Sequence, residues 1–360
     1  MNPSSVVVVG AGLAGARCAE TLRAEGYEGE LVVVGEEAVA PYERPALSKE
    51  FLAGERRSDD LLLRPDDFWA GCGIDLRLRR RVVAVDGSRR TVVTDRGEEL
   101  AWEALVLATG ARPRRLPFAS PGGVHVLRTL ADAAGLKREL LPGTRLVVVG
   151  GGFVGAEVAS TARALGVDVT LLEAGAVPFA RALGTELGHL LSCRYRQWGV
   201  DVRTRTDLTA FRTGGDGRVR AVVLSDGTEL PCDVVLVAIG VEPVQELLPA
   251  EVGLPIHVCG DATGGPGHWT SAAANGAAVA RRILRLDPVP APPPFFWSDQ
   301  FGLRIQLVGD SSRAVRVELD GAEDSFVARY HVSGGRLVAA LAANRPGEVG
   351  ALRRELALAA

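Results

Sequence analysis

Two short glycine-rich stretches hold the residues best suited to chemistry. VVVVGAGLAG covers residues 6–15 and VVVGGGFVG covers 147–155, and in each an apolar run leads into G-x-G-x-x-G. In such a loop the first glycine allows a tight turn, the second lets the main chain approach a pyrophosphate, and the third packs a helix on a strand. The free N–H groups of the helix then meet the diphosphate. The chain therefore has two candidate phosphate loops, formed by Gly10, Gly12 and Gly15 and by Gly150, Gly152 and Gly155.

The elements around each loop complete a β-α-β unit. The first copy predicts strands at 6–9 and 31–34 around a helix at 14–25; the second predicts strands at 146–149 and 167–172 around a helix at 156–165. An acid follows each second strand, Glu36 in the first copy and Glu173 in the second. A carboxylate there accepts hydrogen bonds from ribose hydroxyls and repels a 2′-phosphate. Glu173 therefore favours NADH over NADPH.

The repetition continues beyond the two loops. Residues 81–100 and 207–230 each predict short alternating strands joined by tight turns, and a returning strand then ends at Gly110 or Gly240. Two nucleotide-binding domains thus share one plan, so the chain holds two dinucleotides, or one true site and one relic. The simplest chemistry that joins two dinucleotides is hydride transfer between a nicotinamide and a flavin.

A third fragment indicates which loop takes which nucleotide. PIHVCGDATGG, residues 255–265, predicts a strand that ends at Gly260 and Asp261, followed by a helix over 271–284. Asp261 is either a helix cap or the residue that binds the ribityl chain of a flavin. Because the chain also has two phosphate loops, the interpretation of Asp261 as a ribityl-binding residue is favoured. It places FAD on the N-terminal loop and the nicotinamide on the inserted second copy.

Composition narrows the remaining classes. The 360 residues are 47% hydrophobic and carry a net charge of −3, which is typical of a globular protein and gives no general attraction to nucleic acid or membrane. No apolar run approaches a membrane span, and the N-terminus lacks the features of a signal peptide. The cysteines are scattered without metal-ligating or redox spacing, which indicates no metal site and a reducing cytoplasm: Cys18, Cys72, Cys193, Cys232 and Cys259.

A longer pattern resembles a known family. PYERPALSKEFLAG at 41–54, LATGARPRRLP, AIGVEP, GDAT, HWTSAAANG and FFWSDQFGLRIQLVGD occur in the order found in NADH-dependent ferredoxin reductases of oxygenase systems, which include putidaredoxin and rubredoxin reductases. The resemblance implies an α/β fold with two Rossmann-like domains and a small α+β C-terminal domain. It places the FAD domain at 1–111 and 243–287, the NAD domain at 112–242 and the C-terminal interface domain at 288–360.

The resemblance also implies the site residues. It assigns the catalytic roles to Lys49, Glu157 and Trp297, with Lys49 paired to Glu157 beside the nicotinamide. FAD is expected on Gly10, Gly12, Ala14, Gly15, Glu36, Arg44, Lys49, Val83, Ala108, Thr109, Gly110, Arg128, Gly260, Asp261 and Trp297. NADH is expected on Gly150, Gly152, Phe153, Val154, Gly155, Glu157, Glu173 and Gly240.

Lysine usage supports one of these assignments. Lys49 and Lys137 are the only lysines among 41 lysine and arginine residues. This rarity indicates that position 49 uses the compact ammonium group of lysine, which the planar guanidinium group of arginine does not replace. The alternatives are an exposed Lys49, a first-turn helix acid at Glu157 and an ordinary core tryptophan at Trp297.

Two departures from the family pattern affect the partner. The segment between Gly253 and His257 is shorter than in the family, and the C-terminal domain ends early. Electron exit is expected at Trp297 and Arg304, with Arg281, Arg282 and Arg285 forming a local basic patch for an acidic ferredoxin. Neighbouring acids such as Asp287 and Asp299 are alternative partners of these arginines.

The sequence therefore predicts a cytoplasmic flavoprotein, monomeric or homodimeric, that passes hydride from NADH to FAD. Single electrons then go to a [2Fe-2S] ferredoxin or a rubredoxin serving a P450 or Rieske oxygenase. Two alternatives remain open, an NADH oxidase or quinone-type reductase and an NADH-sensing flavoprotein of apoptosis-inducing-factor type.

Overall fold

The chain forms two compact units, each assembled from separate segments. The computed structural model describes residues 2–249, 253–265, 267–290 and 293–359. The first unit comprises Met1–Glu43, Asp59–Arg112 and Glu242–Pro292; the second comprises Arg44–Ser58, Pro113–Val241 and Pro293–Ala360. The three domains predicted from the sequence stay a prediction, and each unit is described by itself below.

The first unit is built on a parallel sheet of order β18-β7-β1-β2-β3. Its strands are β1 (Ser5–Val9), β2 (Glu30–Val34), β3 (Asp75–Arg77), β7 (Ala104–Leu107) and β18 (Ile256–Val258). The helices are α1 (Leu13–Ala24), α3 (Asp67–Gly71) and α7 (Trp269–Ile283), with short 3₁₀ turns η2 (Asp59–Leu61) and η3 (Gly260–Thr263). A separate antiparallel sheet has β4 (Val82–Asp86), β5 (Thr91–Thr94) and β6 (Glu99–Ala101).

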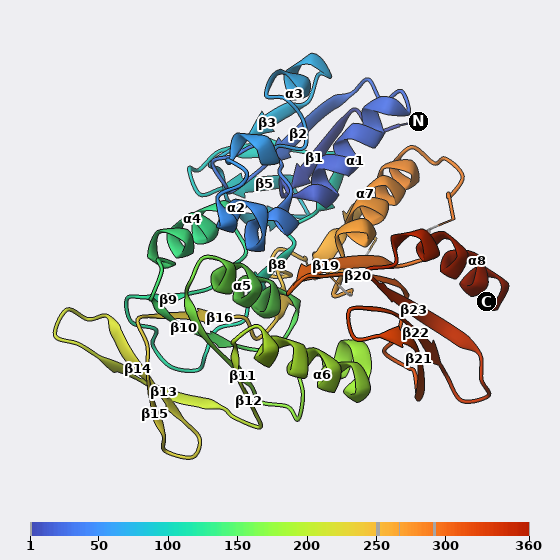
Figure 1. Cartoon of the computed structure of the whole chain (residues 1–360). Helices are drawn as coiled ribbons and strands as arrows, with labels where there is room; N and C mark the ends of the chain where they lie inside the picture. Colours follow the sequence, from blue (N-terminus) through green and yellow to red (C-terminus); the bar gives the residue numbers. More distant parts are fainter. Residues whose placement is uncertain (1, 250–252, 266, 291–292, 360) are drawn as a thin grey trace. The chain divides into compact units, whose positions relative to one another are not determined.

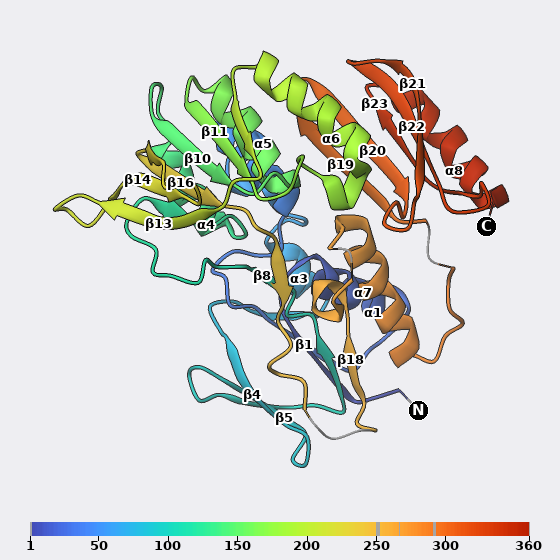
Figure 2. The ribbon, with the colours of Figure 1, turned by 90° about the horizontal axis from the view of Figure 1, so that it is seen from below.

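Strand β1 shows why the first unit folds this way. Val6 and Val8 pack with α1 and α7 on one face of the sheet, while Val7 and Val9 pack with residues from β4, β5 and β6 on the other. A parallel strand covered on both faces reads as a continuous apolar run, which explains VVVV. Helices α1 and α7 run side by side in both views (Figures 1 and 2), and a Cβ on Gly276 would lie 2.2 Å from Ala14 O.

The second unit repeats this plan and adds a C-terminal sheet. Its parallel sheet has the order β12-β11-β10-β16-β9, with β9 (Val124–His125), β10 (Arg145–Val149), β11 (Asp168–Glu173), β12 (Asp201–Thr204) and β16 (Val234–Val237). The helices are α2 (Glu50–Ala53), α4 (Leu130–Glu139), α5 (Phe153–Ala164) and α6 (Ala180–Gln197), preceded by η1 (Arg44–Ser48). The antiparallel sheet has β13 (Leu208–Thr213), β14 (Val219–Leu224) and β15 (Glu229–Pro231).

The C-terminal sheet has the order β19-β20-β23-β22-β21, with η4 (Pro346–Glu348) and α8 (Val349–Ala359) after its last strand. Its strands are β19 (Phe295–Gln300), β20 (Leu303–Gly309), β21 (Arg316–Ala322), β22 (Ser325–His331) and β23 (Leu337–Ala343). One face, including Ile305 and Leu341, shares a core with α5 and α6; the other, including Val308 and Ala340, packs against α8. The short strands β8 (Ala111–Pro113) and β17 (Val241–Pro243) contain the boundaries between the two units.

The predicted fold class is therefore confirmed. Helix ends moved by one to three residues: α5 starts at Phe153 rather than 156 because the helix begins directly after Gly152. Helix α7 starts at Trp269 rather than at 271, with His268 at the N-cap position. Within the part of the chain that the structure describes, no helix is long and apolar enough to cross a bilayer.

Candidate active site

The first glycine loop lies between β1 and α1 in the first unit. Gly10 has φ +116°, and a Cβ there would lie 2.1 Å from Ala108 O, while a Cβ on Gly15 would lie 2.0 Å from Gly10 O. Neither position accepts a side chain. A Cβ on Gly12 would meet nothing within 4 Å, so this glycine borders open space at the start of α1. That space, facing the N-terminus of a helix, fits the diphosphate of a dinucleotide.

The second loop, between β10 and α5 in the second unit, has the same construction. Gly150 has φ +107°, with a Cβ position 2.5 Å from Ala238 O, and a Cβ on Gly155 would lie 2.1 Å from Gly150 O. A Cβ on Gly152 again meets nothing within 4 Å. In both loops, packing requires two of the glycines, and the third borders open space of the kind that a phosphate loop needs.

The two acids differ in position and surroundings. Gly10 N donates to Val34 O and Gly150 N donates to Leu172 O, so Glu173 occupies the place of Gly35, and Glu36 lies one residue further along. Glu36 is exposed. The Glu173 carboxylate instead accepts hydrogen bonds from Gly151 N at 2.9 Å and Gly175 N at 2.7 Å. Glu173 therefore shapes the loop that follows β10, in addition to its expected contact with ribose.

Several of the remaining predicted flavin residues of the first unit lie near the same loop; the Cβ position of Gly10 is 2.1 Å from Ala108 O and 3.1 Å from Thr109 N. A Cβ on Gly260, at φ +67°, would lie 2.7 Å from Cβ of Ala14, so η3 with Asp261 lies beside the first turn of α1. Thr109 Oγ1 donates a hydrogen bond to Val244 O at 2.6 Å. The next residue, Gly110, adopts a left-handed backbone conformation with φ +73°. Val83 is 46% exposed on β4, and its role at the flavin stays a prediction.

Lys49 and Glu157 meet in the second unit. Lys49 directly precedes α2, and its Nζ lies 3.0 Å from Glu157 Oε1 and donates to Pro45 O at 3.0 Å. The side chains of Lys49 and Glu157 are only 10% and 6% exposed. Glu157 lies in α5, the helix that begins at the second glycine loop. The structure thus brings together the ion pair that the sequence predicts, and Lys49 is not an exposed lysine.

Two serines that the sequence analysis missed complete the surroundings of Glu157. Ser48 Oγ donates to Oε2 at 2.5 Å, and Ser298 Oγ donates to Oε1 at 2.6 Å. Burial raises the pKa of the Glu157 carboxyl, and Lys49, Ser298 and Ser48 act against that rise. The signal was present in FFWSDQ: in a strand, Ser298 and Gln300 share one face, and a polar pair on a buried face requires partners.

This geometry can be compared with known proteins. Residues 4–276 match the family described as pyridine nucleotide-disulphide oxidoreductase. The chain belongs to this family. Residues 295–360 match a second family, reductase C-terminal. The resemblance seen in the sequence is confirmed, and the chain is an oxidoreductase of the ferredoxin–NAD(P)⁺ reductase type.

Individual members of the oxidoreductase family cover almost the whole chain. The biphenyl dioxygenase system ferredoxin–NAD⁺ reductase component of Paraburkholderia xenovorans (strain LB400) is 39% identical over 89% of this chain and 85% of its own. Putidaredoxin reductase CamA of Pseudomonas putida is 35% identical over 96% and 89%. A crystal structure of the covalent putidaredoxin reductase–putidaredoxin complex aligns with TM-score 0.93 and 34% identity over 98% of this chain and 93% of that one.

Other residues expected to bind nucleotides in this oxidoreductase have structural partners. The Phe153 ring packs on Phe296 at 4.1 Å and Phe179 at 4.8 Å between centroids, at the start of α5. Val154, in the same turn, is 41% exposed. Gly240, at φ +99°, has its nearest side-chain atom, Arg114 Cδ, 4.0 Å from a built Cβ. Their contacts with NADH stay predictions.

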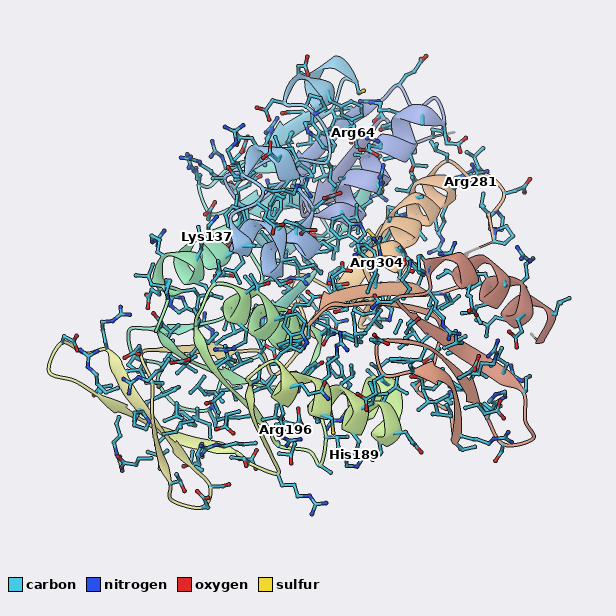
Figure 3. The ribbon with its side chains drawn as sticks, in the orientation of Figure 1. Arg64, Lys137, His189, Arg196, Arg281 and Arg304 are labelled. Atoms are coloured by element: carbon cyan, nitrogen blue, oxygen red, sulfur yellow. The ribbon has the colours of Figure 1, made fainter. Side chains whose placement is uncertain are left out.

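The second unit also contains residues predicted for the flavin. Arg44 Nη1 donates to the main-chain oxygen of Arg128 at 2.6 Å, which brings these two predicted flavin residues together. Trp297 is half-buried on β19, stacked on Phe295 with centroids 6.2 Å apart. Strand alternation places it on the face opposite Ser298 and Gln300. Lys137 on α4 (Figure 3) donates to Phe51 O at 2.8 Å, so both lysines hold main-chain oxygens of the segment 44–58.

Three buried thiols of this family member are unsuited to a redox relay. All five cysteines are free. Cys18 and Cys259 are buried in the first unit; burial, with the neighbouring thiol, raises the pKa of Cys18, and burial raises the pKa of Cys259 to about 12. Burial likewise raises the pKa of Cys232 to about 11. A protonated thiol is a poor nucleophile, so these three groups are structural.

The arginines proposed for docking differ in their partners. Arg281 on α7 pairs with Glu25 and donates to the main-chain oxygen of Asp287, so it stabilises the first unit itself. Arg285, at φ +56°, and Arg304 on β20 are exposed (Figure 3 labels Arg281 and Arg304). Arg281 therefore contacts Asp287 at its main-chain oxygen, and its ion-pair partner is Glu25, which lies 256 positions away in the sequence.

Proposed function

We propose that this chain is an FAD-containing reductase that takes hydride from NADH and delivers single electrons to a [2Fe-2S] ferredoxin or a rubredoxin serving a P450 or Rieske oxygenase. The observation that carries the proposal is the presence of two glycine loops of the same construction in one chain, each with one glycine open to a ligand. The chain belongs to the ferredoxin and rubredoxin reductases of oxygenase systems.

The first loop would hold FAD and the second NADH. Gly12, Asp261 and the N-terminus of α1 would meet the diphosphate and ribityl groups of FAD, since η3 lies beside α1. Gly152 and Glu173 would meet the pyrophosphate and ribose of NADH, and Glu173 would disfavour a 2′-phosphate. When bound, FAD accepts two electrons as hydride and returns them one at a time.

Lys49 and Glu157 would serve the hydride donor. Both groups belong to the unit that carries the second loop, and Glu157 lies one turn into the helix that starts at Gly152. The ammonium group of Lys49 is a compact charge fixed by Glu157 and Pro45 O. A positive charge that the protein already holds in place stabilises negative charge that develops in a transition state, because no protein group has to move during the reaction. Glu157 would thus orient Lys49, and Lys49 would face the reacting groups.

Burial raises the thiol pKa values of Cys18, Cys232 and Cys259, which makes these three thiols poor nucleophiles and favours direct electron delivery from the flavin to a protein acceptor. Among the relatives, one is named a putidaredoxin reductase, one a rubredoxin–NAD⁺ reductase and one a biphenyl dioxygenase component. These names support a small iron–sulfur partner.

A comparison of acceptors tests the proposal. FAD-reconstituted protein is mixed with NADH and cytochrome c, with and without each of a set of [2Fe-2S] ferredoxins and rubredoxins, while oxygen consumption is followed in parallel. The proposal expects fast cytochrome c reduction only when a suitable iron–sulfur protein is present. Rapid oxygen uptake without it would identify an oxidase. Slow turnover under all conditions, with a long-lived reduced complex, would identify a sensor.

A further inference from the structure

A line of buried hydrogen bonds leads from α6 through β19 to Glu157. Tyr195 OH on α6 donates to Gln300 Oε1, Gln300 Nε2 donates to Ser298 Oγ at 3.0 Å, and Ser298 Oγ donates to Glu157 Oε1 at 2.6 Å. Tyr195, Ser298 and Gln300 are buried, with Tyr195 and Ser298 wholly inaccessible. All four residues lie in the second unit.

The chemistry of the groups gives this line a single direction. A tyrosine hydroxyl donates one hydrogen bond, and here its acceptor is the amide oxygen of Gln300. That contact fixes the amide, so the NH₂ group of Gln300 faces Ser298. Ser298 Oγ is then an acceptor toward Gln300, and its one hydrogen goes to Glu157. Every donor in the line therefore points toward the carboxylate.

Neighbouring contacts fix the two ends of this arrangement. Phe301 N, directly after Gln300, donates to Ser160 Oγ at 2.7 Å, which holds the end of β19 against α5. On the other side, Thr161 Oγ1 donates to Ser48 O at 2.8 Å while Ser48 Oγ donates to Glu157. Ser160 and Thr161 lie one turn after Glu157 on α5, so one helix organises both flanks of the carboxylate.

We propose that Tyr195, Gln300 and Ser298 are positioning residues that orient the Glu157 carboxylate toward Lys49. The C-terminal sheet then helps to position the Lys49 ammonium group, because Ser298 and Gln300 on β19 orient Glu157. Tyr195 on α6 contributes by fixing the side-chain amide of Gln300. The orientation itself depends only on contacts within the second unit. Its consequence for hydride transfer rests on the proposed function.

The ionisable and charged groups near Glu157 determine how its pKa changes when the hydrogen bonds from Tyr195, Gln300 and Ser298 are lost. Lys49, at the start of α2, is an ionisable group that lowers the pKa of Glu157, and burial, with the Glu157 carboxylate, in turn raises the pKa of Tyr195 on α6. Other charged residues nearby have partners of their own. Glu173, at the end of β11, accepts hydrogen bonds from Gly151 N and Gly175 N, and Arg44 in η1 donates to Arg128 O. Asp299 lies on the opposite face of β19 from Ser298. Burial raises the pKa of Glu157 and Ser298 lowers it, so a weakened Ser298 contact raises the pKa further.

A titration of Glu157 tests the proposal without an activity assay. FAD-reconstituted protein carrying ¹³C-labelled glutamate carboxyl groups is titrated by NMR, and Glu157→Gln identifies the signal. The variants are Tyr195→Phe, Ser298→Ala and the conservative Ser298→Thr, which keeps the hydroxyl. Tyr330→Phe is the matched control, because Tyr330 is equally buried in the same unit but donates to Leu183 O instead.

The expected result is a rise in the Glu157 midpoint of about 0.5–1 pH unit in Ser298→Ala, which removes one hydrogen bond to the carboxylate. A smaller rise is expected in Tyr195→Phe, because Tyr195 acts on the carboxylate through Gln300 and Ser298. Ser298→Thr and Tyr330→Phe should titrate like the parent protein. Unchanged midpoints in Tyr195→Phe and Ser298→Ala, in protein whose near-ultraviolet circular dichroism is native, would overturn the proposal. Failure of the proposed function would show differently, as an unmodified protein that NADH does not reduce.

Discussion

Lys49 Nζ lies 3.0 Å from Glu157 Oε1, although the two residues are more than 100 positions apart and both are nearly buried. Removing one partner of a buried ion pair leaves the other charge without compensation. The same contact that would place the ammonium for hydride transfer therefore also stabilises the fold, and a variant must be tested for both effects.

Lys49→Gln should slow the reduction of FAD by NADH at least 10-fold, which corresponds to about 1.4 kcal/mol of lost transition-state stabilisation. It should also lower the free energy of unfolding by roughly 3–5 kcal/mol because Glu157 is left unpaired. Anaerobic stopped-flow absorbance and urea denaturation measure the two effects. Lys49→Gln combined with Glu157→Gln should regain much of the stability but not the rate. A double variant that regained the rate would remove Lys49 from the chemistry.

Glu173→Ala combined with Ala174→Arg should shift the preference from NADH toward NADPH by roughly 2–4 kcal/mol, since a carboxylate is lost and a cation gained beside the 2′-position. Because Glu173 also accepts from Gly151 N and Gly175 N, Glu173→Ala alone should weaken the binding of both nucleotides. Glu173→Gln, which keeps one acceptor oxygen, is the control. The ratio of kcat/KM for the two nucleotides is the measurement, and an unchanged ratio in the double variant would place Glu173 away from the ribose.

Charge reversal at Arg304 or Arg285, tested singly, should slow the reduction of an acidic ferredoxin and flatten its dependence on salt. Ferricyanide reduction should stay near that of the parent protein, because a small acceptor needs no docking surface. Arg90→Glu is a matched control for Arg285→Glu, since both arginines are exposed at positive φ, +51° and +56°. Arg281→Glu is uninformative because Arg281 pairs with Glu25. Equal losses with ferredoxin and ferricyanide would exclude a docking role.

Alkaline pH should destabilise the first unit through Cys18 and Cys259. Burial raises both thiol pKa values above the ordinary 9.0, to about 12 for Cys259, so the folded state keeps protons that the unfolded state releases. Stability is then fully present below about pH 9 and falls above it by up to about 1.4 kcal/mol per pH unit for each group. Urea midpoints between pH 8 and 11 should fall less steeply in Cys18→Ala with Cys259→Ala than in the exposed control Cys193→Ala. Equal slopes would contradict this assignment.

Local sequence patterns were sufficient to predict the β-α-β elements around the two glycine loops. A buried apolar run followed by Gly10 or Gly150 fixes a strand, a turn and a helix within about 25 residues, because each step depends on neighbours in the chain. The offset between Glu36 and Glu173 was not predicted, since it depends on the register of β1 with β2 and of β10 with β11. The two acids lie at similar distances in sequence from their loops. The offset appears only when the hydrogen bond from Gly10 N to Val34 O is compared with that from Gly150 N to Leu172 O.

The sequence FFWSDQ indicated that Ser298 and Gln300 need buried partners, but it did not identify Glu157 and Tyr195 as those partners. Ser298 lies 141 positions from Glu157, and Tyr195 lies 105 positions from Gln300. Their contacts arise because one face of the C-terminal sheet shares a core with α5 and α6. No local propensity encodes that packing; it follows from which apolar faces cover one another. Lys49 was predicted only because it is so rare in this chain and because a family resemblance paired it with Glu157.

The central claim is that one chain binds FAD and NADH on its two loops and moves hydride between them. An anaerobic titration of FAD-reconstituted protein with NADH, followed at the visible absorbance of the flavin, tests this most directly. The account predicts one FAD per chain, released unmodified by denaturant, and complete bleaching by one equivalent of NADH. Failure to retain FAD, or bound FAD that NADH leaves unbleached, would contradict it.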